Sequence, residues 1–183
     1  MGKLTIVIVY VDDIIVTGDD FEEIERLTKK LAKEFEIKDL GRLKYFLGIE
    51  VAQSRKGILI SQQKCILDLL KETNMLGCKL IDTPIKQNYK LGEAQEDAAV
   101  ECGMYQCLVG KLIYLSHTRS DIAYVVNVVS QFMHSPKEVH LEVIYKILHY
   151  LKFTPGKGIL FKKNEELSLE TYTDADWAKS VAN

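Results

Sequence analysis

The sequence has little of the residues that mark several specialised protein classes. It contains 3 prolines and 4 cysteines in 183 residues, and no stretch approaches the roughly 18 apolar residues that a membrane span needs. The cysteines show neither C-x-x-C zinc spacing nor a dense disulfide framework, so we expect reduced, mostly buried thiols. The N-terminus lacks the charged and apolar regions of a signal peptide, so nothing argues for export. We therefore expect an intracellular protein with no membrane partner, in a compartment that the sequence does not specify.

An excess of charge of either sign is also missing. The chain carries 24 Lys and Arg against 26 Asp and Glu, a net charge of −2, with a pI near 6.1. This balance excludes a polycation that grips nucleic acid by bulk charge, so any such contact must be local. The hydrophobic content of 47% is ample for a core and excludes a disordered chain. The length suits one ordinary domain or two very small ones.

The chain opens on two apolar runs separated by two acids. Residues 4–11 are almost wholly β-branched and aromatic, which predicts a strand covered on both faces. Asp12 and Asp13 follow, and residues 14–17 predict a second short strand. We therefore expect a tight hairpin with both carboxylates at its tip. Behind it, Asp20 is expected to cap an amphipathic helix.

The rest of the pattern mixes short strands with helices. Residues 45–51 and 58–60 predict a second hairpin, and Ser61 is expected to cap a helix that ends near Gly77. Residues 78–98 have no clear period and predict a linker. Later segments are expected to form three helices between residues 99 and 153, then strands at 159–161 and 167–173. The fold class that we expect is α+β.

The acidic pair admits two interpretations from the residues alone. Two carboxylates about 4 Å apart repel by about 4 kcal/mol at an effective dielectric constant of about 20. A divalent cation relieves this repulsion, and Mg²⁺ takes carboxylate oxygens while keeping waters for phosphate ligands. Alternatively, Asp-Asp is simply good turn chemistry. The two flanking apolar strands make the context unusual and favour the metal-binding interpretation for Asp12 and Asp13.

Residues 10–13, YVDD, resemble the YxDD box of reverse transcriptases, and their surroundings resemble the copia type of retrotransposon polyprotein. Further matching segments follow in the same order as in that family: residues 35–41, 45–51, 82–84, 108–115, 121–124 and 150–152. Residues 172–178 resemble the opening strand of the ribonuclease H domain that follows the polymerase. The chain thus resembles the C-terminal part of a copia-type reverse transcriptase together with the start of ribonuclease H.

This resemblance implies a domain arrangement. Residues 1–77 would form a partial reverse-transcriptase palm, in which β-hairpins pack with helices and the YVDD hairpin carries the acids. Residues 78–98 would be the linker, and residues 99–153 a helical thumb or connection. Residues 159–183 would form a truncated, ribonuclease H-like β-stub.

The resemblance also implies an RNA-directed DNA polymerase that uses two-metal nucleotidyl transfer. Asp12 and Asp13 would be catalytic and would bind Mg²⁺ or Mn²⁺, and Asp174 would be a metal ligand of the incomplete ribonuclease H stub. The expected partner is a primer–template nucleic acid, an RNA–DNA hybrid. The other expected site residues position primer or template: Tyr10, Val11, Phe46, Leu47 and Gly48.

The family pattern places a third catalytic carboxylate and the fingers upstream of the YVDD hairpin, before residue 1. We therefore expect this polypeptide to be inactive alone and not to bind the metal tightly, because positioning and electrostatic stabilisation supply most of such catalysis. A separately encoded N-terminal half would be a possible partner. The alternative is a non-catalytic remnant of a transposable element that binds nucleic acid or protein.

Overall fold

The computed structural model describes residues 2–77, 83–84 and 100–163. These residues contain helices and two antiparallel sheets, which confirms the expected α+β class. The chain divides into two compact units, Met1–Lys44 and Tyr45–Asn183. The boundary between them falls inside residues 1–77, which the sequence analysis treated as one partial palm. Within the described ranges, no helix is long and apolar enough to cross a membrane.

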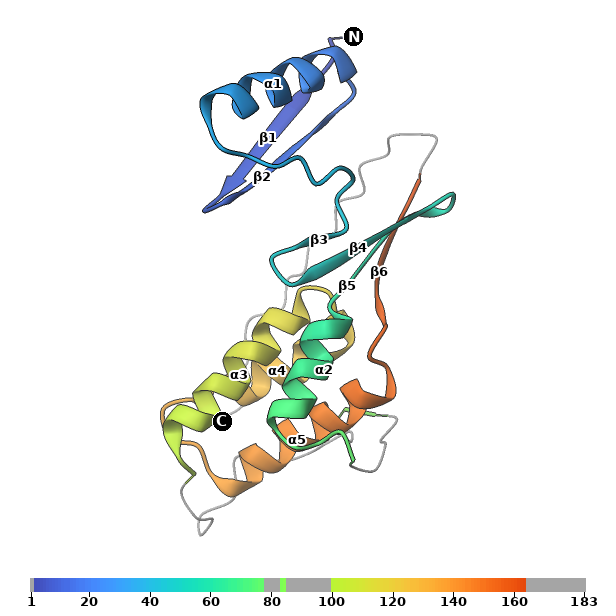
Figure 1. Cartoon of the computed structure of the whole chain (residues 1–183). Coiled ribbons are helices and arrows are strands. Elements are labelled where there is room, and N and C mark those ends of the chain that lie inside the picture. Colours follow the sequence, from blue (N-terminus) through green and yellow to red (C-terminus); the bar gives the residue numbers. More distant parts are fainter. Residues whose placement is uncertain (1, 78–82, 85–99, 164–183) are drawn as a thin grey trace. The chain divides into compact units, whose positions relative to one another are not determined.

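The first unit is a hairpin followed by a helix (Figure 1). Strands β1 (Thr5–Tyr10) and β2 (Asp13–Gly18) pair antiparallel, and helix α1 (Phe21–Glu34) follows. The Asp20 carboxylate accepts a hydrogen bond from the Glu23 backbone N–H at 3.2 Å, which confirms the predicted cap. The helix then packs its apolar side against β2.

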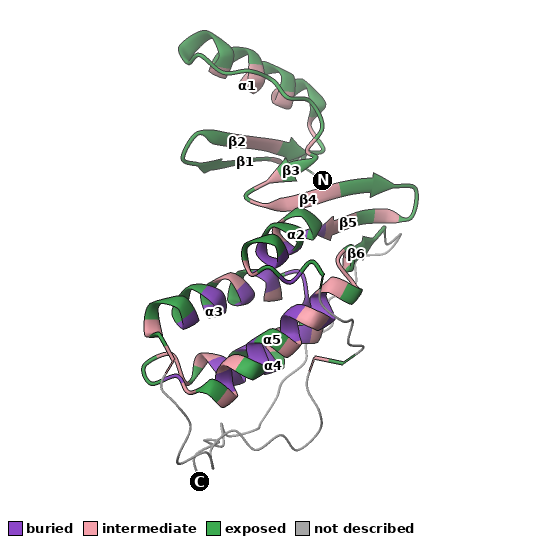
Figure 2. Cartoon of the chain, turned by 60° about the horizontal axis from the view of Figure 1, so that its bottom comes forward, coloured by how far each residue is buried: buried purple, intermediate pink, exposed green. Residues whose placement is uncertain are grey.

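The expectation that the first strand is covered on both faces is wrong. All of β1 after Thr5 is exposed, and α1 has no buried residue (Figure 2). Within this unit, α1 is the one described element that packs on the hairpin, and it contacts β2. An apolar run shows that a strand has surface suited to burial. The strand becomes buried only where another layer of the protein packs on it. The exposed apolar residues of the run are Leu4, Ile6, Val7, Ile8, Val9, Tyr10 and Val11.

The second unit joins a four-stranded antiparallel sheet to a helical bundle (Figure 1). The strands, in sheet order, are β3 (Tyr45–Phe46), β4 (Ile49–Ser54), β5 (Gly57–Ser61) and β6 (Gly158–Lys162). The helices are α2 (Gln63–Glu72), α3 (Cys102–Ser116), α4 (Ser120–Ser130) and α5 (Glu138–Phe153). All four helices therefore lie, along the chain, between two strands that are neighbours in the sheet.

The hydrophobic core lies in the bundle rather than in the sheet (Figure 2). Helices α2 to α5 direct their apolar stripes inward, as the spacing of their Leu, Ile and Val residues predicts. The most completely buried members are Ile66, Tyr105, Val109, Leu112, Ile122, Val129, Val143, Ile144, Ile147, Leu148 and Leu151. The buried core thus depends on contacts between helices far apart in the sequence.

The predicted helix after the second hairpin has the wrong ends. Ser61 is the last residue of β5, and the residue that precedes the helix is Gln62, whose side chain makes no capping bond. The helix ends at Glu72 instead of near Gly77, because Asn74 adopts a positive φ of 55°. The Met75 and Asn74 N–H groups then bond back to the Leu70 and Lys71 carbonyls, the pattern of a Schellman motif.

Three further expectations concern the last strands, the linker and the cysteines. The expected strand at residues 159–161 is confirmed as part of β6, which pairs with β5. Residues 164–183, and all of the predicted linker except residues 83 and 84, lie outside the described residues. Among the described cysteines, Cys65 and Cys102 are partly buried and Cys107 is exposed, so the prediction of mostly buried thiols is wrong for these three.

Candidate functional site

The YVDD motif forms the tip of the β1–β2 hairpin. The two loop residues are Val11 and Asp12, while Asp13 is the first residue of β2 and pairs with Tyr10. The sequence analysis placed both acids in the loop, so the observed turn is displaced by one residue. The displacement leaves Asp12 at the bend and Asp13 at the start of a strand, one residue apart on an exposed tip.

The backbone at the tip is strained at Val11. This residue has a φ of 48°, although it is β-branched and its side chain is 80% exposed. Two-residue hairpin loops with positive φ at the first position normally carry glycine there. A conformation of this kind costs about 1–3 kcal/mol and is concentrated at functional sites.

The Asp12 and Asp13 carboxylates differ from the two acids that follow them. Asp19 accepts a hydrogen bond from the Leu4 N–H, and Asp20 caps α1. The Asp12 and Asp13 side chains have no hydrogen-bond or ion-pair partner within the part of the chain that the structure describes. Their oxygens are therefore free for an external ligand, and hard oxygen donors of this kind suit Mg²⁺.

The hairpin is not a complete metal cage. In the described ranges, no cluster of three His, Cys, Asp or Glu side chains is placed to hold a metal ion. Asp12 and Asp13 are two neighbouring carboxylates, and Asp174 lies outside the described residues. The structure thus places the expected acids at one tip without a third ligand beside them.

The expected primer-positioning residues form a second tight turn, in the other unit. The sequence predicts one strand over residues 45–51, but the chain folds back at Leu47 and Gly48, whose φ values are 49° and 79°. Phe46 pairs with Ile49 across this turn. Positive φ at both central residues is the type I′ pattern, and Gly48 is the residue type that such a turn favours. The strand prediction failed because the apolar residues on both sides concealed this turn.

Two residues that the sequence analysis did not select hold this turn. The Tyr114 hydroxyl of α3 donates to the Leu47 carbonyl, and the Cys65 thiol of α2 donates to the Gly48 carbonyl at 3.3 Å. A Cβ atom at Gly48 would lie 3.1 Å from the Cys65 sulfur. The turn is therefore fixed against the first two helices of the bundle. No sequence pattern could have identified Cys65 and Tyr114, because their contacts join distant segments.

A buried charge cluster lies where the bundle meets β6. The Arg119 guanidinium is 1% exposed and donates two hydrogen bonds of 2.9 Å to the Asp121 carboxylate. It also donates to the carbonyl and hydroxyl oxygens of Thr154, at 2.8 and 2.7 Å. The Tyr150 hydroxyl and the Lys157 ammonium complete the surroundings of Asp121, at 2.6 and 3.0 Å. This cluster joins the start of α4 to the end of α5 and the turn before β6.

The cluster makes stability depend on pH. Burial alone would raise the pKa of Asp121, but hydrogen bonds from Arg119, Tyr150 and Lys157 outweigh burial and hold this pKa well below its ordinary value. A carboxyl group with a lowered folded-state pKa stabilises the fold above its unfolded pKa of about 3.9, and this stabilisation is lost as the pH falls further. We expect the free energy of unfolding, measured with urea, to fall below about pH 5. The fall should be smaller in Asp121→Asn, and an equal fall would contradict this assignment.

Comparison with known proteins identifies the family of this chain. Residues 1–87 match the family model described as reverse transcriptase (RNA-dependent DNA polymerase). An uncharacterised mitochondrial protein of Arabidopsis thaliana is 36% identical over 173 residues, which cover 93% of this chain and 71% of that protein. The chain belongs to the reverse transcriptase family, in its copia-type Pol polyprotein branch.

Two transposon proteins illustrate this branch. The retrovirus-related Pol polyprotein from transposon RE1 of Arabidopsis thaliana is 44% identical over 178 residues, 97% of this chain. The polyprotein from transposon TNT 1-94 of Nicotiana tabacum is 35% identical over 191 residues, 100% of this chain. The chain spans only 12% and 14% of these two relatives. No solved structure matches it.

Proposed function

We propose that this chain is the C-terminal part of an RNA-directed DNA polymerase and contributes two catalytic carboxylates, Asp12 and Asp13. The observation that carries this proposal is the strained, exposed hairpin tip, whose two acids have no partner within the described residues. Asp12 at the bend would be the main ligand and Asp13 the weaker one. Tyr10 and Val11 would flank the end of the primer.

The donor set at the tip suits Mg²⁺ or Mn²⁺, because it offers adjacent carboxylate oxygens on a paired strand ribbon. When bound with a complete ligand set, such metals activate the primer hydroxyl and stabilise the charge on the transferred phosphate. Asp12 and Asp13 would hold the cation, and the hairpin fixes the positions of their backbones relative to each other. With two acidic ligands instead of three, we expect weak metal binding by this chain alone.

The β3–β4 turn would position the primer, through Phe46, Leu47 and Gly48. Support comes from its rigidity, because Tyr114 and Cys65 fix the two turn carbonyls. A turn held in this way presents its backbone in one conformation, as a positioning element requires. Asp174 would belong to the start of the ribonuclease H-like region, as a metal ligand.

We also propose that residues 1–183 do not synthesise DNA alone and require a preceding segment, supplied in the same chain or as a separate N-terminal half. The exposed apolar β1 strand supports this requirement, since it offers a sheet edge and apolar faces for a further layer. The RNA–DNA hybrid would be the substrate of the assembled protein.

Primer extension on an RNA template with Mg²⁺ or Mn²⁺ tests this function. The sample is this chain joined in frame to the segment directly preceding the matching region of the RE1 polyprotein. We expect incorporation by the joined protein and none by residues 1–183. Incorporation by residues 1–183 above that of an Asp12→Asn, Asp13→Asn control would overturn the requirement for a preceding segment. No incorporation by the joined protein would favour the alternative, a non-catalytic remnant, for which the incomplete ligand set is the supporting observation.

A further inference from the structure

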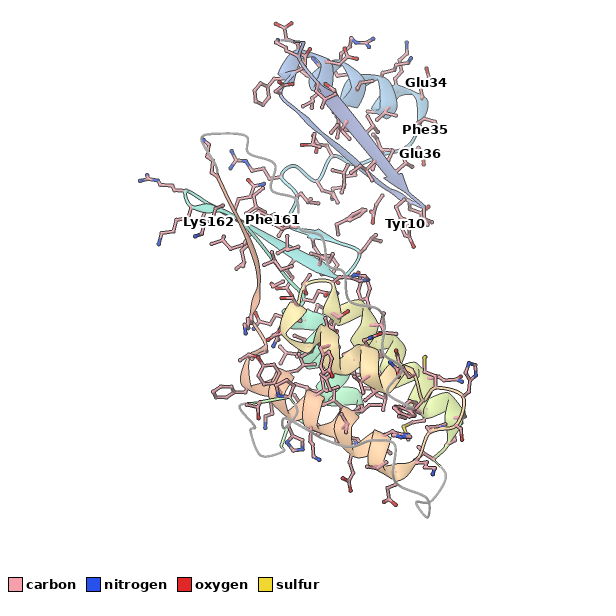
Figure 3. The ribbon with its side chains drawn as sticks, turned by 180° about the vertical axis from the view of Figure 1, so that it is seen from behind. Tyr10, Glu34, Phe35, Glu36, Phe161 and Lys162 are labelled. Carbon is pink, nitrogen blue, oxygen red and sulfur yellow. The ribbon has the colours of Figure 1, made fainter. Side chains whose placement is uncertain are left out.

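Four basic side chains meet at one end of the four-stranded sheet. Arg55 and Lys56 form the loop between β4 and β5, and Lys162 lies opposite Gly57 on the neighbouring strand β6. The Lys163 N–H donates to the Lys56 carbonyl at 3.4 Å, which extends the pairing past the end of β6. We call these four residues the basic sheet end. Figure 3 shows nitrogen-tipped side chains gathered at this end, beside the labelled Lys162.

The positive charge of the basic sheet end is not neutralised within the described residues. All four side chains are exposed, and none of them forms an ion pair with a described carboxylate. Some exposed cations elsewhere have such partners, as Lys29 does with Glu25 and Lys111 with Glu72. The pairing of β5 with β6 therefore concentrates like charges instead of separating them. Like charges in neighbouring strands repel, so a fold that keeps them together favours an anion at this place.

The chemistry of the patch fits a phosphate chain. Arg55 and Lys56 lie in the loop before β5, and Lys162 and Lys163 lie at the paired end of β6. Because neighbouring strands lie about 4.8 Å apart, the loop and the strand end bring several donors to one place. Phe161 precedes Lys162 on β6 and has 55% of its surface exposed, and exposed aromatics interleaved with cations are typical of nucleic-acid surfaces. The chain has a net charge of −2, so it cannot attract nucleic acid by its overall charge. A local cluster of cations such as this one supplies the attraction instead.

We infer that the basic sheet end is a nucleic-acid backbone site, in which Arg55, Lys56, Lys162 and Lys163 bind phosphates independently of the YVDD tip. The inference rests on the proposed function only in taking the nucleic acid to be the primer–template hybrid. The site forms from the tertiary pairing of β5 with β6, so neither basic pair makes it alone. It holds the hybrid in place and takes no part in nucleotidyl transfer.

The test measures binding instead of polymerisation. A labelled RNA–DNA hybrid of about 20 base pairs is titrated with residues 1–183 by fluorescence anisotropy, at salt concentrations between about 50 and 200 mM. The variant carries Arg55→Gln, Lys56→Gln, Lys162→Gln and Lys163→Gln. The matched control carries Lys30→Gln, Lys33→Gln, Lys38→Gln and Lys44→Gln, which remove the same charge from exposed positions of the first unit. A third variant keeps the charge with Lys56→Arg, Lys162→Arg and Lys163→Arg.

Each phosphate contact contributes about 0.9 to the slope of log K against log salt. We expect the Gln variant to lower the magnitude of this slope by about 3.6 and to weaken binding at least about tenfold at low salt. The control and the charge-keeping variant should stay near the parent chain. Equal slopes for the variant and the control, or no measurable binding by the parent, would overturn the inference. Competition by an acidic peptide as strong as by unlabelled hybrid would also overturn it, in favour of a protein partner.

These results separate the site from the proposed function. The joined polymerase can extend a primer while its basic sheet end binds no phosphate, in which case this inference fails alone. Conversely, the parent chain can bind the hybrid in a salt-dependent way and the Gln variant can lose this binding, while the joined polymerase is inactive. In that case the proposed function fails and this inference holds. Urea unfolding of each variant verifies that lost binding does not come from lost structure.

Discussion

An Arg119→Met variant is expected to lose about 3 kcal/mol of unfolding free energy. The reason is that removal of the buried guanidinium leaves the negative charge of Asp121 without its main partner. The substitution keeps side-chain volume but deletes the bonds to Asp121 and Thr154. The Thr154 carbonyl then loses the guanidinium but keeps the Lys157 N–H, and part of the Asp121 carboxylate loses its donor. Since Asp121 keeps its bonds to Tyr150 and Lys157, the loss should fall at the lower end of the range for broken buried pairs.

The measurement is urea unfolding of residues 1–183, with Lys111→Met as the matched control. Lys111 pairs with Glu72 in the same unit, but both side chains are well exposed. Such surface pairs contribute about 0–1 kcal/mol, so the control should unfold nearly as the parent does. A loss in Arg119→Met no larger than in Lys111→Met would show that the buried cluster does not stabilise the bundle.

The parts of the fold that sequence predicts well are those set by local pattern. The helix that begins after Asp20 follows from its cap and apolar spacing, and the buried stripe of α2 follows from Ile66, Leu69 and Leu70. The YVDD hairpin follows from two apolar runs around a polar bend. In each case neighbouring residues carry the whole signal, so no knowledge of distant partners is needed.

The parts that sequence does not predict depend on distant partners or on unusual dihedral angles. The β3–β4 turn was missed because Leu47 takes a positive φ that leucine rarely adopts. The pairing of β6 with β5 could not be predicted, since four helices separate the two strands along the chain. The sequence does not identify the Arg119 cluster, because its members Tyr150 and Thr154 are remote in sequence from Arg119 and Asp121. The sequence motif points to Asp12 and Asp13 as the candidate site. The contacts of Cys65 and Tyr114 with the β3–β4 turn are visible only in the structure.

An Asp12→Asn substitution in the joined polymerase is expected to cause the second large effect, a loss of at least about 100-fold in nucleotide incorporation. Asparagine keeps the shape of the side chain but removes the negative charge that binds a divalent cation. Asp12 lies in the exposed loop with no side-chain partner in the described chain, so the fold should not change. Asp19→Asn is the matched control, because Asp19 lies nearby but is engaged with Leu4.

The central claim is that the YVDD tip holds the catalytic cation, and its most direct test compares these two variants in one primer-extension assay. Incorporation is measured for the joined protein, for Asp12→Asn and for Asp19→Asn at several Mg²⁺ concentrations. The claim predicts that Asp12→Asn alone loses activity and that unfolding by urea is unchanged. Activity in Asp12→Asn within a few-fold of the parent would contradict it.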